Sequence, residues 1–319
     1  MTNTAPAAAP APRRVDWSRG KWPAAACVLY AAALLAHPLL PNGERNSGSL
    51  IETFLPWSAL AIVPLLLIAL LRRSPLALAA VLLPSLTWLA LFGNSLTDKR
   101  DRAGELTVVS HNIGAHNRDP AAAARALAGT GAQIIAVQEL SPEAKDTFHR
   151  ALPPRYRHHT VQGGVGLWST YEMTAAAPVD IMPWPRALRA TLTTPKGPVT
   201  VFVAHLASVR VTPESGFTTS RRDAAAHLLT EAVKRDRTPR TLVVGDFNGT
   251  PHDRGLSALR RGMTSAQDTA GSGFGFSWPA RFPLARIDHI LSRGLHPTSA
   301  HTLPATGSDH LPVSASFSF

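Results

Sequence analysis

Three nearly uncharged apolar blocks occupy most of the first 95 residues of this 319-residue chain. They run from 22 to 41, from 50 to 71 and from 75 to 93. A helix of about 20 apolar residues crosses the ~30 Å hydrocarbon core of a bilayer. The first block alone, preceded by four basic residues, also fits a cleaved signal peptide, and any single block fits a buried core helix. Three blocks in close succession favour three transmembrane helices.

The basic residues around these blocks predict their orientation. Four basic residues precede the first block, and Arg72 and Arg73 separate the second from the third. The loop from Asn42 to Glu52 has one basic residue, Arg45. Because cytoplasmic loops are enriched in Lys and Arg, the N-terminus is expected in the cytoplasm. Three crossings then place everything after residue 95 outside the membrane, although the basic residues in 99–102 weigh the other way.

Composition divides the chain further. Residues 1–21 are predicted to be a disordered cytoplasmic tail, 22–93 the three transmembrane helices, 94–104 a polar linker and 105–319 a globular domain. A single cysteine excludes a disulfide scaffold, and 45% hydrophobic residues exclude a disordered chain. The net charge of +11 is compatible with nucleic acid, anionic lipid headgroups or phosphorylated substrates.

Strand-like and helix-like runs alternate after residue 105. Strands are predicted at 106–111, 134–138, 165–168, 188–193, 199–205, 241–245, 287–291 and 312–317, and helices at 120–128, 142–152, 219–235 and 253–261. Asp119-Pro120 is a helix start signal, with a capping residue followed by proline in the first turn. The pattern predicts a mixed α/β sandwich.

Polar residues suited to phosphate chemistry follow these apolar runs. They are Asn112 in VVSHNIG, Glu139 in IIAVQEL, His205 in VFVAHL, Asp246 and Asn248 in LVVGDFN, Asp288 in RIDHIL, and Asp309 and His310 in GSDHLP. Any one of them fits a turn former or helix cap. Together they supply oxygen ligands for a hard divalent cation and imidazoles for phosphate oxygens.

These blocks, in this order, resemble the endonuclease/exonuclease/phosphatase superfamily, which has the deoxyribonuclease-I-like fold. The resemblance covers 105–319, and GDFN with a terminal SDHLP is its most specific part. It implies a four-layer α/β/β/α sandwich of two mixed sheets and a divalent-metal-dependent phosphoric ester hydrolase using Mg²⁺ or Mn²⁺.

The resemblance also implies a role for each residue. Asn112, Glu139 and Asp309 match the residues of the metal shell, and Asp246, Asn248, His205, His310 and Asp288 match the catalytic residues. Gly114 stands where related nucleases have an acidic residue, which makes a second metal doubtful. The arginine that usually follows a middle strand is replaced by Thr170, and Arg189 or Arg222 is expected to substitute for it.

The membrane anchor narrows the substrate. Three helices followed by this domain resemble actinobacterial membrane-anchored proteins of the teicoplanin-resistance VanJ type, which implies a phosphatase for polyprenyl phosphate or pyrophosphate in cell-wall synthesis. An extracytoplasmic nuclease, a phospholipid phosphodiesterase and a membrane protein that binds a phosphorylated ligand without turnover stay open. The aromatic stretch 271–282 fits either core packing or an apolar lip over the site. The sequence leaves the oligomeric state open.

Overall fold

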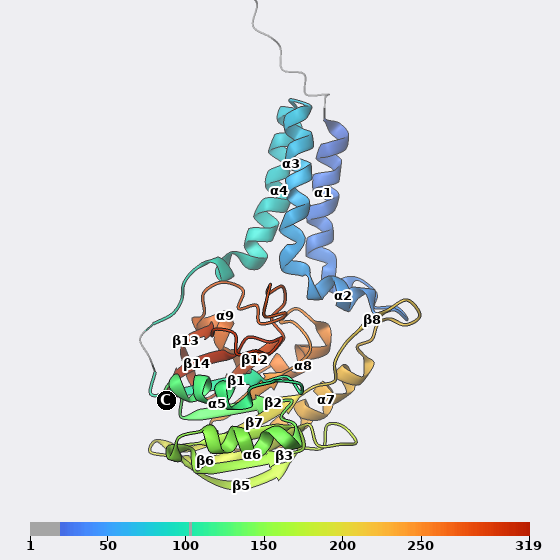
Figure 1. The fold of residues 1–319 in the computed structure, drawn as a ribbon. Helices are drawn as coiled ribbons and strands as arrows, with labels where there is room; N and C mark the ends of the chain where they lie inside the picture. Colours follow the sequence, from blue (N-terminus) through green and yellow to red (C-terminus); the bar gives the residue numbers. More distant parts are fainter. Residues whose placement is uncertain (1–19, 102–103) are drawn as a thin grey trace, which may run out of the picture. The chain divides into compact units, whose positions relative to one another are not determined.

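The computed structural model describes residues 20–101 and 104–319 and divides into two units (Figure 1). The helical unit comprises Met1–Ala36 and Pro56–Leu91, and the sheet unit comprises His37–Leu55 and Phe92–Phe319. The predicted tail, up to residue 19, lies outside the described residues. The predicted division placed 37–55 among the membrane helices, whereas its contacts in the structure are with the sheet unit.

The helical unit contains α1 (Lys21–Ala36), α3 (Ile62–Leu71) and α4 (Pro75–Phe92, whose last residue belongs to the sheet unit). Small side chains pack between these helices, among them Cys27, Ala69 and Ala77. Lys21–Leu39 and Pro75–Leu96 are each long and apolar enough to cross a membrane. A third span exists only if Ser47–Thr53 and Leu55–Leu71 form one broken crossing. The described chain therefore offers two spans, or up to three.

Residues His37–Leu55, called the connecting segment below, join α1 to the 3₁₀ helix Leu55–Ala61 that leads into α3. The segment contains a short 3₁₀ turn (His37–Leu39) and α2 (Ser47–Thr53). The buried Glu52 carboxylate of α2 pairs with the Arg254 guanidinium at 2.8 Å. Further hydrogen bonds join Arg254 Nη1 to the Leu40 carbonyl (2.8 Å) and Asn46 Nδ2 to the Phe217 carbonyl (2.7 Å). These bonds attach the connecting segment to the sheet unit.

Two six-stranded mixed sheets form the rest of the sheet unit. In the first sheet the strand order is β13-β14-β1-β2-β4-β3, and in the second it is β11-β12-β10-β7-β6-β5. The strands of the first sheet are β1 (Leu106–Asn112), β2 (Ile134–Gln138), β3 (His158–Gln162), β4 (Val165–Ser169), β13 (His296–Thr302) and β14 (Val313–Ser318). Those of the second are β5 (Glu172–Pro178), β6 (Ala187–Thr194), β7 (Gly197–His205), β10 (Thr241–Asp246), β11 (Thr264–Ser265) and β12 (Asp288–Arg293), and β8 (Val211–Thr212) pairs separately with β9 (Gly216–Phe217).

The layers follow from which residues each face buries. The sheets pack face to face through aliphatic side chains such as Val108, Val201 and Val244. On the outer face of the first sheet lie α5 (Pro120–Gly129) and α6 (Pro142–Ala151). On the outer face of the second lie α7 (Ser220–Arg235) and α8 (Ser257–Arg260), and the short α9 (Ala266–Ala270) contacts β13. This arrangement confirms the predicted α/β/β/α sandwich of two mixed sheets.

The strand directions bring the polar strand ends to one end of the sandwich. β1 runs parallel to β2, so Asn112 pairs with Gln138 just before Glu139. β10 runs parallel to β7 and antiparallel to β12, so Asp246 lies beside both His205 and Asp288. β14 runs antiparallel to β1, which places the 309–310 turn at the same end. One end of the sandwich therefore brings together side chains that are spread over about 200 residues of sequence.

The strands predicted from the sequence agree closely with the buried strands of the structure. All eight predicted strands are present within two residues at each end, and Asp119 caps α5 as expected by accepting from the Ala122 amide. The prediction missed three longer strands, β3, β5 and β13, which are all edge strands. Their residues are largely half-buried or exposed, so they lack the apolar run that marks a central strand.

Gly245 is required by the close approach of β10 to β7. Its φ is +140°, and a Cβ there would overlap the carbonyl oxygen of Ala204. Gly245→Ala should lower the free energy of unfolding by about 3 kcal/mol through backbone strain and overpacking. This corresponds to a thermal midpoint roughly 6–12 °C lower, measured by intrinsic fluorescence of the detergent-solubilised chain. In Gly129→Ala, whose added methyl meets no atom within 4 Å, the midpoint should stay close to that of the wild type. Equal midpoints for the two variants would contradict this account.

Candidate active site

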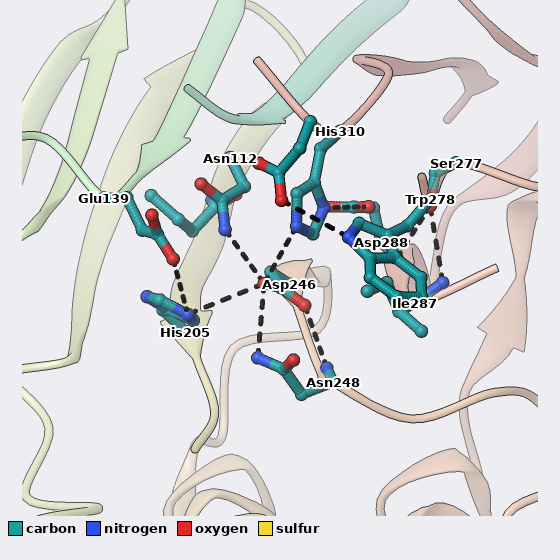
Figure 2. A network of polar contacts seen from close by, with 12 residues as sticks. Asn112, Glu139, His205, Asp246, Asn248, Ser277, Trp278, Ile287, Asp288 and His310 are labelled. Atoms are coloured by element: carbon teal, nitrogen blue, oxygen red, sulfur yellow. Dashed lines mark hydrogen bonds and ion pairs between the residues drawn. The ribbon is translucent and has the colours of Figure 1, made fainter. Parts of the chain in front are cut away.

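Asp246 is the hub of the polar network at this end of the sandwich (Figure 2). Its buried carboxylate accepts hydrogen bonds from Asn112 Nδ2 (2.9 Å), the Asn248 backbone amide (2.9 Å) and Asn248 Nδ2 (3.2 Å). Burial and the neighbouring Asp288 raise the pKa of Asp246, and the two nearby histidines and Asn112 oppose that rise. The carboxylate is thus held in place by neutral donors and keeps a tendency to take up a proton.

His310 and Asp288 form a buried pair beside this hub. His310 Nδ1 lies 2.8 Å from Asp288 Oδ2, and its Nε2 lies 3.9 Å from Asp246 Oδ2. Burial alone would lower the pKa of His310, but Asp288, Asp246 and Asp309 raise it to about 10. His310 is therefore an imidazolium at neutral pH, which suits it to donate to phosphate oxygens.

His205 has the opposite character. Burial lowers the pKa of His205 to about 4, despite the opposing charge of Asp246. Its Nε2 is buried without a hydrogen-bond partner, 3.5 Å from Asp246 Oδ2 and 3.6 Å from Glu139 Oε1. A buried polar atom without a partner is uncommon and calls for a ligand or water at that position. It therefore points to a bound group between these carboxylates.

Two residues of the site adopt left-handed backbone conformations. Glu139 has φ +55° and Asn248 has φ +48°. Such conformations cost of order 1 kcal/mol or more and concentrate at functional sites. Oε2 of Glu139 accepts from the Ala115 amide at 3.0 Å, and Asn248 is held by its bonds to Asp246 and the Leu206 carbonyl. Both residues turn out of their strand ends toward the network.

Asp309 lies at the rim of the site rather than within the buried network. It is exposed and accepts a hydrogen bond from Trp278 Nε1 at 3.3 Å. Trp278 comes from the aromatic stretch 271–282, in which Phe274 and Phe276 stack on each other. Trp278 therefore agrees with the prediction of an apolar lip over the site, whereas Phe274 and Phe276 agree with the prediction of core packing.

All eight residues expected from the sequence thus lie at this one end. Asn112, His205, Asp246, Asn248, Asp288 and His310 form the buried network, Glu139 contacts it through His205, and Asp309 stands at its rim. Their chemical roles stay a prediction.

The two arginines expected to substitute for a missing one lie elsewhere. Arg222 is fully buried, pairs with Asp253 at 2.7 Å and donates to the Asn248 carbonyl at 3.0 Å, so it supports Asn248 from behind. Arg189 is exposed and lines a separate hollow. A further arginine beside the site, Arg186, was missed by the sequence analysis, because its place beside His205 depends on the pairing of β6 with β7.

The donor set fits a divalent cation. Ligand atoms of Asp246, Asp288 and His310 lie within 4.8 Å of one another. His310 and Asp288 are, however, bonded to each other, and a protonated imidazole cannot ligate a metal. Carboxylates of Glu139 and Asp246 flanking the unpartnered His205 nitrogen are the better candidates. Asn112 directs its amide nitrogen to Asp246, and its oxygen accepts from the Gly114 amide.

A cavity of about 360 Å³, called the reaction pocket below, opens onto these residues. Its polar lining residues include Glu139, Asp246, Asn248, Asp309 and His310. Its lining also contains apolar residues, among them Leu50, Phe54, Val209, Val211, Trp278 and Ile287. Two of these apolar residues, Leu50 and Phe54, belong to the connecting segment.

Comparison with known proteins agrees with this geometry. The model of the endonuclease/exonuclease/phosphatase family matches residues 109–310, and the chain belongs to this family. It is therefore related to hydrolases of phosphoester bonds, a class that generally uses divalent metals. No curated protein matches the chain by sequence.

Solved structures show the same fold at low identity. A mannosyl-6-phosphatase from Bacteroides thetaiotaomicron is 17% identical with a TM-score of 0.56, over 67% of this chain and 100% of that one. A conserved protein of unknown function from Enterococcus faecalis is 15% identical with a TM-score of 0.56, over 66% and 99%. D. rerio TDP2 complexed with a single-strand DNA product is 16% identical with a TM-score of 0.54, over 66% and 98%.

Glu139→Gln removes a negative charge from the site while keeping its shape. Hydrolysis of bis(p-nitrophenyl) phosphate should fall by on the order of 10²-fold, with a higher Mg²⁺ or Mn²⁺ concentration needed for half-maximal rate. Glu143→Gln, an exposed glutamate on α6, is the matched control and should leave both quantities unchanged. An unchanged metal requirement in Glu139→Gln would remove Glu139 from the metal shell.

Proposed function

We propose that this protein is a membrane-anchored, divalent-metal-dependent phosphoric ester hydrolase that acts on a lipid phosphate at the outer membrane face. A polyprenyl phosphate or pyrophosphate of cell-wall synthesis is the substrate we favour, in line with the resemblance to the VanJ type. The observation that carries the proposal is the mixed lining of the reaction pocket, which combines residues suited to phosphate chemistry with apolar side chains.

Part of the apolar lining of the reaction pocket comes from a segment that joins two candidate membrane helices. Leu50, Thr53 and Phe54 of the connecting segment line the pocket together with Asp246 and His310. Phe54 is 43% exposed, so an apolar chain lying on it would be removed from water. A substrate with a phosphate head and a hydrocarbon tail matches this mixed lining.

The attachment of the connecting segment also constrains the topology. Glu52 on α2 makes charge-assisted hydrogen bonds to Arg254, 202 residues later, at 2.8–3.1 Å. The backbone amide of Arg254 also donates to Glu52 Oε2. Segments bonded in this way must lie in one compartment. The chain between them therefore crosses the membrane an even number of times, as the second and third spans predicted from the sequence would together.

The residues of the site support in-line attack of water on phosphorus. Asp246 orients the water and takes up its proton, for which its raised pKa suits it, and Asn248 fixes the carboxylate. The bond from phosphorus to the ester oxygen opposite the water breaks, and the alcohol leaves. His310, protonated and held by Asp288, donates to the phosphate oxygens as charge develops, and His205 lies near Asp246 beside them. A divalent cation bound by Glu139 and its neighbours would neutralise phosphate charge.

The basic residues before α1 and at Arg72–Arg73 predict that the sheet unit is outside the cytoplasm. An alkaline phosphatase fused after Phe319 should therefore be active in cells, because that reporter folds only after export. A fluorescent reporter that needs the cytoplasm should stay dark at the same position. The reverse pattern would place the site in the cytoplasm and overturn the outer-face assignment.

Phe54→Ala tests the lipid substrate directly. The ratio of kcat/KM for farnesyl phosphate to kcat/KM for p-nitrophenyl phosphate should fall about tenfold, the value expected for losing roughly 50 Å² of apolar contact. Phe282→Ala is the control, since Phe282 is exposed and does not line the pocket. A ratio unchanged in Phe54→Ala would contradict a hydrocarbon tail at this wall. DNA cleaved faster than either phosphate would favour the nuclease alternative.

A further inference from the structure

A second hollow adjoins the reaction pocket. It has a volume of about 610 Å³ and is lined by three arginines, Arg186, Arg210 and Arg221. Ser208 lines both this hollow and the reaction pocket, so the two are neighbours. Among the described residues of its lining, Glu44 alone is acidic. We call it the arginine hollow, and its charge is strongly positive.

The three guanidinium groups have no carboxylate partner in the described residues, although Arg186 Nη1 donates to the Leu206 carbonyl at 3.5 Å. Five arginines of the sheet unit, by contrast, each contact an aspartate or glutamate, namely Arg222, Arg254, Arg260, Arg286 and Arg293. The arginine hollow therefore concentrates positive charge that is free to meet an anion from outside.

Arg186 links the arginine hollow to the reacting groups. Its carbonyl accepts from the His205 amide at 2.8 Å, so the two residues face each other across β6 and β7. Residues directly opposite in an antiparallel pair project their side chains from the same face. Glu139 and Asp246 both act on the Arg186 charge, and burial lowers its pKa. Arg186 thus lies beside the reaction pocket, whereas Arg210 and Arg221 are exposed.

We propose that the arginine hollow binds a second phosphate group of the substrate whose first phosphate is attacked at Asp246. Planar guanidinium groups match phosphate oxygens in bidentate fashion, and a half-buried one binds more strongly than a fully solvated one. The enzyme then prefers a diphosphate ester over the monophosphate of the same alcohol. That the alcohol is a lipid rests on the proposed function. The binding of a second phosphate is argued from the arginine hollow itself.

The double variant Arg210→Gln/Arg221→Gln tests this proposal in the full-length protein in detergent. The substrates are geranyl monophosphate and geranyl diphosphate, which differ only in the second phosphate. The ratio of kcat/KM for the diphosphate to that for the monophosphate should fall about tenfold or more, since charged hydrogen bonds are lost. Arg189→Gln, an exposed arginine of β6 outside the hollow, should keep the wild-type ratio.

A second readout needs no turnover of a diphosphate. Inhibition of bis(p-nitrophenyl) phosphate hydrolysis by methylenediphosphonate should weaken about tenfold in the double variant, and inhibition by methylphosphonate should weaken much less. Equal changes for the two phosphonates, or an unchanged geranyl ratio, would overturn the second phosphate site. The phosphonates carry no hydrocarbon chain and no membrane is present. The phosphonate result therefore does not depend on whether the natural substrate is a lipid. It also cannot arise from the phosphate of a neighbouring lipid headgroup.

Discussion

The site depends on keeping one buried carboxylate, that of Asp246, in place at the meeting point of two sheets. A buried carboxylate is costly unless donors surround it, and here the donors are Asn112 on β1 and Asn248 in the turn after β10, while two histidines lie 3.5–3.9 Å away. Because β1 and β10 belong to different sheets, the packing of the two sheets brings Asn112 to Asp246, and Gly245 allows β10 to approach β7 closely. The strand directions and Gly245 together therefore fix the position of Asp246 relative to its neighbours.

In the proposed function, substrate selection depends on the two hollows that surround this centre. The connecting segment supplies Leu50 and Phe54 to the apolar lining of the reaction pocket, and the arginine hollow lies beside it. The same segment contributes Glu44 and Asn46 to the lining of the hollow. The pair formed by Glu52 and Arg254 holds the segment, so a stretch between two candidate membrane helices shapes both binding regions. In the proposed function this segment therefore takes part in substrate recognition.

Much of this was predictable from the sequence, for a physical reason. The central strands are buried on both faces, so their sequences are apolar runs. The site residues are the polar residues at the ends of those runs. Edge strands such as β5 carry mixed, exposed residues and give no such signal. Glu52 and Arg186 were not recognised, because their partners are fixed only by tertiary pairing. Glu52 read as a charge at the rim of an apolar block, and only the fold reveals Arg254 beside it.

The most direct test of the central claim is the structure of the full-length protein with Mg²⁺ and a non-hydrolysable farnesyl phosphonate, by crystallography or cryo-electron microscopy. The account predicts the phosphonate between Asp246, His205 and His310, with the farnesyl chain lying on Leu50 and Phe54. A phosphonate bound at Asp246 whose chain leaves without touching residues 37–55 would contradict the role of the connecting segment. A phosphonate bound away from Asp246 would contradict the assignment of the site.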